Sequence, residues 1–142
     1  MRVLAVLATA AAALALAAPS PGERTSTVGA HASAYGTILF DGRGFVLYVF
    51  TRDPQGHSKC TGACAKAWPP FLVRGRPSAA RGATAKLLGT TRRGDGTRQV
   101  TYAGRPLYYY VGDRSAGQIL CQDVVEYGGR WLVVRPSGRA VR

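Results

Sequence analysis

Short runs of hydrophobic and β-branched residues, separated by turn residues, fill the chain from position 35 onward. Residues 36–40 and 45–51 form the first two runs, and Asp41-Gly42-Arg43-Gly44 separates them. Asp-Gly supplies the positive φ angle that a tight turn requires, so this stretch predicts a β-hairpin. Residues 98–102 and 106–111, joined by Ala103-Gly104, predict a second hairpin.

The two predicted hairpins share one motif, aromatic-x-aromatic-x-x-Asp. Its members are Tyr48, Phe50 and Asp53 in the first copy and Tyr108, Tyr110 and Asp113 in the second. Side chains alternate along a strand, so the two aromatic residues of each copy share a face, and each Asp falls where the strand turns. We therefore expect two pseudo-repeated antiparallel hairpin units.

Other segments add little helix to this pattern. Ser58 is a candidate N-cap for one short helical turn around Cys60 and Cys64, which ends at the double proline after Trp68. Residues 74–97 are rich in Gly, Ala, Ser and Arg and are expected to form a long surface connection. The fold class is therefore all-β or β-dominated, with sandwich and barrel both open.

The first residues differ from the rest of the chain. An apolar, Ala-rich run follows Arg2 and ends in an A-x-A signal, which is typical of a cleaved secretory signal peptide over residues 1–17. The alternative to a cleaved signal peptide is an uncleaved membrane anchor formed by the same residues. Residues 18–34 are expected to form a flexible tether and residues 35–142 a single two-repeat β domain. No Cys lies near the cleavage point, so we expect a secreted or periplasmic protein without a lipid on an N-terminal Cys.

Charge is strongly unbalanced, with 19 Lys and Arg against 7 Asp and Glu and a formal net charge of +12. This sign favours contact with an anionic envelope polymer, whereas the plainer interpretation is a solvated basic surface. The chain has no motif that reads a nucleic-acid groove, so specific nucleic-acid binding is not expected.

The three cysteines leave several arrangements open. Cys60 and Cys64 are close enough in sequence to form a disulfide in an oxidising compartment, and their spacing differs from the C-x-x-C of thiol oxidoreductases. Cys121 is then a free thiol or pairs elsewhere, in this chain or between chains. Alternatively His57, Cys60, Cys64 and Cys121 supply the ligand types of a closed zinc site.

Catalysis would have to use Asp53 and Asp113, the carboxylates in equivalent positions of the two repeats, as a hydrolase acid/base pair. Turn chemistry explains the same residues without catalysis, because Asp accepts hydrogen bonds from nearby backbone amides. The aromatic members of the motif are core residues or, if several share an exposed face, a platform for a small ligand.

The motifs together resemble a bacterial family of secreted repeats, described as predicted lipoproteins with a Y-x-(F/W/Y)-x-x-D motif. The residues that carry the resemblance are, in order, Leu47-Tyr48-x-Phe50-x-x-Asp53, Ser58-x-Cys60-x-x-x-Cys64-x-x-x-Trp68-Pro69-Pro70, Asp95-Gly96-x-x-Gln99-Val100-Thr101-Tyr102-x-Gly104-x-Pro106-Leu107-Tyr108-x-Tyr110-x-x-Asp113 and Trp131-x-Val133-Val134. The resemblance implies a two-repeat, β-rich exported protein whose biochemical function is not established. This chain departs from many members of the family because it lacks a lipid-attachment Cys.

We therefore expect an exported, noncatalytic, envelope-associated module that is structural or binds an anionic polymer or small ligand. No cofactor is expected, and no transmembrane anchor is expected after cleavage. The hydrolase and the metal-binding protein are the two alternatives, and the oligomeric state stays open.

Overall fold

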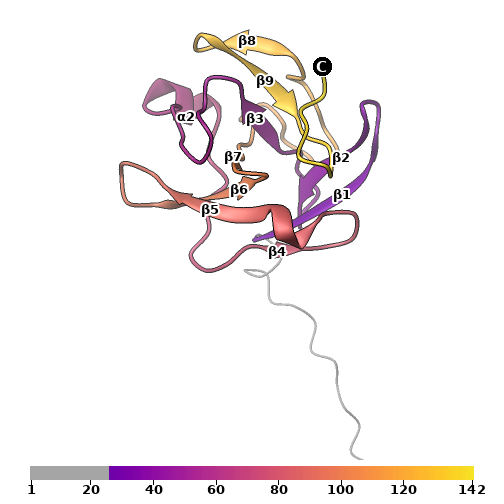
Figure 1. The fold of residues 1–142 in the computed structure, drawn as a ribbon. Helices are drawn as coiled ribbons and strands as arrows, with labels where there is room; N and C mark the ends of the chain where they lie inside the picture. Colours follow the sequence, from indigo (N-terminus) through magenta and orange to yellow (C-terminus); the bar gives the residue numbers. More distant parts are fainter. Residues whose placement is uncertain (1–25) are drawn as a thin grey trace, which may run out of the picture.

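A computed structural model describes residues 26–142, which fold into short strands with very little helix (Figure 1). The strands are β1 (Thr27–Ser33), β2 (Gly36–Asp41), β3 (Tyr48–Phe50), β4 (Ser78–Ala79), β5 (Leu88–Arg92), β6 (Arg98–Tyr102), β7 (Arg105–Pro106), β8 (Val124–Glu126) and β9 (Gly129–Val133), and the helical segments are α2 (Ala63–Ala67) and the 3-10 turn η1 (Ala85–Leu87). The β-dominated fold class and the single short α-helix beside Cys60 and Cys64 are confirmed.

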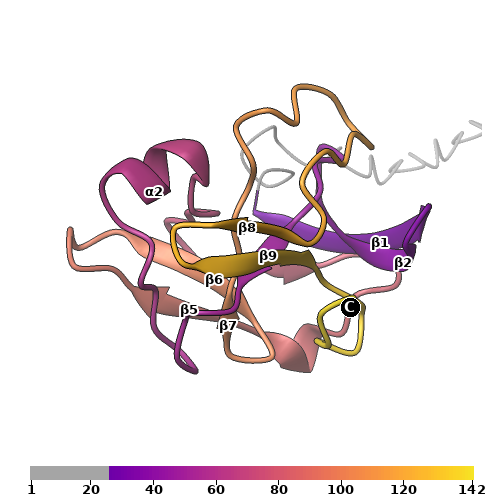
Figure 2. The ribbon, with the colours of Figure 1, turned by 90° about the horizontal axis from the view of Figure 1, so that it is seen from above.

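The strands form three small sheets, ordered β2-β1-β4, β3-β9-β8 and β5-β6-β7. Isolated bridges add pairing between these strands and the segments outside them, and one of the bridges joins Tyr48 to Tyr108. Figures 1 and 2 show the β1–β2 hairpin on the side of the molecule away from α2. The centre of the molecule is thus the place where segments of the two repeats meet.

The N-terminal part of the domain begins earlier than predicted. Residues 27–33 were expected within a flexible tether, but they form β1, which pairs with the whole of β2 from Val28↔Asp41 to Ser33↔Gly36. Val28 is fully buried, and its neighbours Gly29 and Ala30 are small enough for residues 80–82 to approach closely. Long-range pairing therefore orders a segment whose composition is that of a linker. The predicted signal peptide and residues 18–25 lie outside the described residues.

The segment 74–97 is also more regular than expected. It contains β4, η1 and β5, and β5 pairs antiparallel with β6 from Leu88↔Tyr102 to Arg92↔Arg98. Gly96, at φ 84°, lies in the turn between them, where the Arg93 N–H donates to the Thr97 carbonyl and the Gly96 N–H donates to the Arg93 carbonyl. The expected surface connection is therefore wrong for its second half, which is one arm of a hairpin.

The two predicted hairpins form in part. Ala103 and Gly104 turn β6 into β7 with positive φ angles of 50° and 73°, as expected for a tight turn. After Asp41 the chain also reverses, with an isolated bridge between Phe40 and Val46. The main partner of β2 is nevertheless β1, and β3 pairs with β9.

Strand β3 is buried on both faces and separates two hydrophobic clusters. Tyr48 and Phe50 face a cluster with Trp68, Tyr108 and Trp131, whereas Leu47 and Val49 face the other with Leu107 and Leu132. Alternation along the strand explains this division. No helix among residues 26–142 is long and apolar enough to span a membrane.

Candidate functional site

The site predicted from sequence is built around Tyr48 and Tyr108, which lie side by side at the centre of the fold. Each backbone N–H donates to the carbonyl oxygen of the other, and both N···O distances are 2.9 Å. Both side chains are fully buried. The equivalent residues of the two repeats therefore contact each other directly.

Each of the two tyrosine hydroxyl groups binds an aspartate of the other repeat. The Tyr48 hydroxyl donates to Asp113 Oδ2 at 2.7 Å, and the Tyr108 hydroxyl donates to Asp53 Oδ2 at 2.6 Å. Each hydrogen bond joins a tyrosine of one repeat to the aspartate of the other. The motif is thus completed across the repeats and not within one copy.

Each aspartate uses its second oxygen to hold a following loop. Asp53 Oδ1 accepts from the Lys59 backbone N–H at 2.7 Å, and Asp113 Oδ1 accepts from the Leu120 N–H at 2.9 Å. Both oxygens of each carboxylate are therefore engaged inside the protein, which is the bonding pattern expected of an aspartate that organises a turn.

Burial dominates the electrostatics of these four groups. It raises the pKa of both Asp53 and Asp113, while the hydrogen bonds from tyrosine and backbone N–H oppose that rise. Burial, followed by the hydrogen bond to a carboxylate, raises the pKa of Tyr48 and Tyr108 well above the usual value for tyrosine. The tyrosines therefore stay protonated and act as donors.

The second aromatic residue of each motif belongs to a stack of rings. Phe50 stacks on Trp131 with centroids 4.2 Å apart, Trp131 stacks on Trp68 at 4.0 Å, and Tyr110 lies 4.7 Å from Trp68 at a tilt. Glu126 accepts the Trp68 indole N–H at 2.8 Å. Phe50, Trp68 and Trp131 are buried, so they pack the core and do not form an exposed platform.

The disulfide is confirmed, because Cys60 and Cys64 are bonded to each other. Gly62 precedes the helix α2 that carries Cys64, so the predicted capping role of Ser58 is wrong. The Ser58 hydroxyl instead hydrogen-bonds the Tyr108 hydroxyl at 2.7 Å and belongs to the network around the disulfide.

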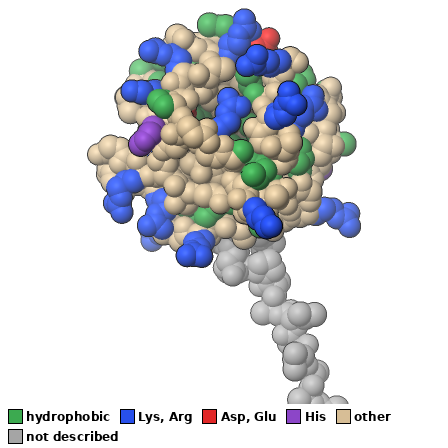
Figure 3. Space-filling view, in the orientation of Figure 1, with side chains coloured by type: hydrophobic (Ala, Val, Ile, Leu, Met, Phe, Trp, Pro, Cys, Tyr) green, Lys and Arg blue, Asp and Glu red, His purple; other side chains and the backbone are tan. Residues whose placement is uncertain are grey.

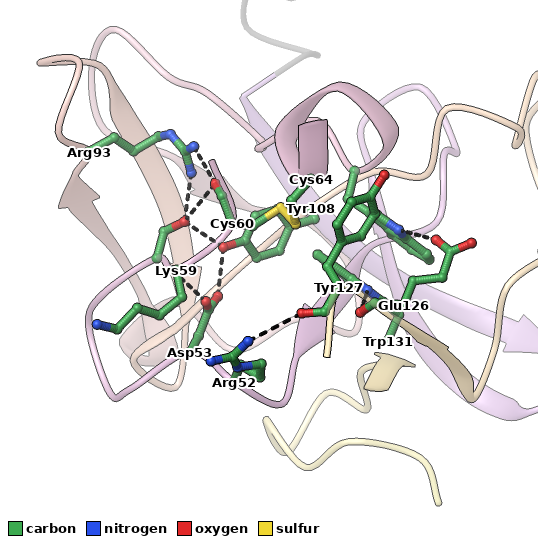
Figure 4. Close-up of a disulfide and its surroundings, with 12 residues drawn as sticks. Arg52, Asp53, Lys59, Cys60, Cys64, Arg93, Tyr108, Glu126, Tyr127 and Trp131 are labelled. Carbon is green, nitrogen blue, oxygen red and sulfur yellow. Dashed lines mark hydrogen bonds between the residues drawn. A yellow bond between two sulfur atoms is a disulfide. The ribbon is translucent and has the colours of Figure 1, made fainter. Parts of the chain in front are cut away.

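Arg93 ties this disulfide loop to the hairpin of β5 and β6 (Figure 4). Its guanidinium donates to Ser58 Oγ, to the Cys60 carbonyl and to Gln99 Oε1, at 2.7–2.8 Å. Gln99 is fully buried and donates to the Leu107 carbonyl. The sequence assigned no role to Arg93, whereas Gln99 and Ser58 both fall inside the motif pattern.

Cys121 is a free, buried cysteine whose origin the repeat explains. Cys60 follows Lys59 and Cys121 follows Leu120, the two residues whose N–H groups the aspartates hold. Cys121 is therefore the counterpart of Cys60. The position four residues later is Val125 in β8, so the second repeat has no partner equivalent to Cys64.

The zinc site considered from sequence does not form. Two of its four ligands, Cys60 and Cys64, are joined in the disulfide. Within residues 26–142 no group of three or more His, Cys, Asp or Glu side chains is placed to hold a metal ion. For the hydrolase alternative, the structure places each of Asp53 and Asp113 in the turn at the end of its own motif, where each accepts a hydrogen bond from a different tyrosine of the other repeat.

Acidic and basic side chains are used very differently in this domain. Glu23 precedes the described part, and each of the other six acidic side chains accepts at least one hydrogen bond from the protein: Asp41, Asp53, Asp95, Asp113, Asp123 and Glu126. Within residues 26–142, only Arg43 and Arg130 form salt bridges. Lys and Arg groups project on all sides of the face in Figure 3, whereas acidic groups show at one place.

Comparison with known proteins gives one match. The model of a family described as "Secreted repeat of unknown function" matches residues 29–71 and 89–135, one copy for each half of the domain, and the two copies span more than half of the chain. The first copy contains Tyr48 and Asp53 and the second contains Tyr108 and Asp113. No curated protein and no solved structure matches.

Proposed function

Because this chain belongs to the family of secreted repeats of unknown function, we propose that it is an exported, noncatalytic module of the cell envelope that binds an anionic polymer through its basic surface. The family description supports the exported part of this proposal. The charge distribution supports the binding part.

One observation carries the proposal, namely that the acidic side chains are occupied within the protein while most basic ones are not neutralised. Arg2 and Arg24 precede the described part, so 17 of the 19 basic residues belong to it, against six acidic ones. Only two of these 17 form salt bridges with the described residues. A surface with this excess of positive charge attracts polyanions over one Debye length, which is about 8–10 Å at physiological salt.

The noncatalytic part of the proposal is supported by the bonding of the shared motif. Asp53 and Asp113 each accept one hydrogen bond from a buried tyrosine and one from a backbone N–H. A general acid or base needs an oxygen within hydrogen-bond reach of a substrate proton. Here those oxygens hold the two repeats together instead.

Co-sedimentation of the folded secreted protein with cell-wall preparations tests this function. We expect binding that weakens steadily as the salt concentration is raised from about 50 to 500 mM, since the contacts are ionic. A neutral polysaccharide serves as the control and should retain no protein. Absence of binding to every anionic preparation at low salt would overturn the proposed function.

A further inference from the structure

Two arginines face each other across the hairpin that ends the described chain. Val134 and Ala140 form a bridge, and the Arg135 N–H donates to the Arg139 carbonyl at 2.9 Å, so Arg135 and Arg139 occupy opposite positions. Side chains at opposite positions of an antiparallel pair lie on the same face, and like charges there are destabilising. The two arginines therefore belong to opposite arms of one hairpin, and the Arg135 guanidinium reaches Gly36 at the start of β2.

The same hairpin forms one wall of an open groove of about 780 Å³. Four arginines line it, namely Arg105, Arg135, Arg139 and Arg142, together with the hydroxyl residues Thr51 and Ser137, and its other lining residues are apolar. The lining contains no acidic side chain. The groove therefore combines concavity with a high density of positive charge.

The groove is held in shape by contacts between the C-terminal hairpin and the turn after β6. The Tyr102 hydroxyl donates to the Pro136 carbonyl at 2.7 Å. Gly138 packs so closely on Ala103 that a Cβ atom there would lie 2.4 Å from the Ala103 Cβ. Arg105 in β7 follows this turn directly, and it lines the same groove as the arginines of the hairpin.

The four positive charges are not neutralised within residues 26–142. None of the four guanidinium groups forms a salt bridge there, because the two salt bridges involve Arg43 and Arg130. Burial and the positive charge of Arg142 lower the pKa of Arg105, and the nearby Asp53 only partly offsets them. Asp53 is itself engaged by Tyr108 and Lys59.

The number of arginines in this groove favours a phosphate polymer over a polycarboxylate. A guanidinium presents a planar fork of N–H donors that matches either oxyanion. Here the four guanidinium groups belong to β7, to both arms of the hairpin and to Arg142, so the positive charges come from separate segments of the chain. A linear phosphate polymer carries a negative charge at each of its closely spaced phosphates, so a short run of it can contact several guanidinium groups, whereas a polycarboxylate built of sugar rings carries one charge on each ring.

We propose that this arginine groove, formed by Arg105, Arg135, Arg139 and Arg142, is the principal binding site for the phosphate groups of a linear polyanion. The inference rests on the proposed function and names its site and its ligand class. Repeating phosphates occur both in phosphodiester polymers and in inorganic polyphosphate. The groove recognises the chemistry that these two sources share.

The test measures the affinity of the folded secreted protein for long-chain polyphosphate, for a poly(glycerol phosphate) and for a polycarboxylate, polygalacturonate, by titration calorimetry. The groove variant is Arg135→Gln with Arg139→Gln. The matched control is Lys66→Gln with Arg114→Gln, which removes the same charge from exposed positions outside the groove. Circular dichroism and the melting temperature verify that both variants are folded.

We expect the groove variant to bind either phosphate polymer at least tenfold more weakly, and the control variant to lose less than threefold. The relative affinities of the two phosphate polymers identify the source of the ligand. Equal losses in both variants would overturn the groove while leaving the proposed function intact. Tighter binding of polygalacturonate than of both phosphate polymers would overturn the ligand class, and absence of binding to any polyanion would overturn the proposed function itself.

Discussion

Tyr48 donates its hydroxyl hydrogen to Asp113, the aspartate of the other repeat, at an O···O distance of 2.7 Å. The reciprocal bond runs from Tyr108 to Asp53 at 2.6 Å. The two tyrosines also form a backbone pair with each other. Neither repeat can therefore satisfy its own motif, and the pair of repeats is the unit that folds.

This exchange predicts an unusual pattern of energetic coupling. In a double-mutant cycle, Tyr48→Phe and Asp113→Asn should couple by about 1.5–3 kcal/mol, the range for a hydrogen bond to a charged group. Tyr48→Phe and Asp53→Asn, which lie in the same motif, should couple by less than about 0.5 kcal/mol. Urea unfolding of the wild type, the three single variants and the two double variants measures both values.

The reciprocal cycle with Tyr108→Phe and Asp53→Asn is the internal control and should give the larger coupling again. Each aspartate variant should also lower the free energy of unfolding by about 1–3 kcal/mol, because a buried donor loses its acceptor. A larger coupling within a motif than across the repeats would contradict the exchange.

Alkaline pH should destabilise the protein steeply. Burial raises the pKa of Tyr48 and Tyr108 in the folded state, whereas both ionise near pH 10 in the unfolded chain. Their contribution is fully present below about pH 10 and is lost as the pH rises above it, because the unfolded state then binds fewer protons. Tyr48 and Tyr108 together contribute about 2.7 kcal/mol per pH unit to this slope.

Urea midpoints measured between pH 9 and pH 11.5 check this slope. Tyr48→Phe removes one ionising group, so its slope should be smaller by about 1.4 kcal/mol per pH unit. An unchanged slope in this variant would show that Tyr48 ionises equally easily in the folded protein.

Gly138→Ala should destabilise the hairpin that carries the arginine groove. Gly138 has a φ angle of 85°, and the added Cβ atom would overlap Ala103. We expect a loss of about 2–4 kcal/mol from the left-handed backbone and the steric overlap together. Gly75→Ala is the matched control, since a Cβ atom there meets nothing within 4 Å, and its melting temperature should change little.

The cysteines should behave as one disulfide and one protected thiol. Cys60→Ser with Cys64→Ser should lower stability by about 2 kcal/mol, the chain-entropy value for so small a loop. Cys121 is buried, and burial raises the pKa of its thiol, so it should react with a thiol reagent far more slowly in the folded than in the urea-unfolded protein. A count of one thiol per unfolded, unreduced molecule confirms the assignment, and a count of zero or three contradicts it.

Several features could be predicted from the sequence because they depend on local chemistry. The turn at Ala103-Gly104, the β-dominated class and the disulfide between Cys60 and Cys64 each depend on residues that are close in sequence. Turn residues restrict φ angles and short loops bring cysteines together whatever the rest of the fold does. The repeated motif could also be recognised in the sequence, because each copy spans only a few residues.

Tertiary structure decided the features that depend on distant partners. Residues 27–33 and 88–92 have weak strand character, and they become β1 and β5 because β2 and β6 offer complete antiparallel partners. The groove collects Arg105 and Arg135, which lie thirty positions apart in sequence. The sequence by itself thus determined two tyrosines and two aspartates in repeated positions, whereas only the packed fold decided that each tyrosine binds the aspartate of the other repeat, because hydrogen-bond partners follow proximity in space.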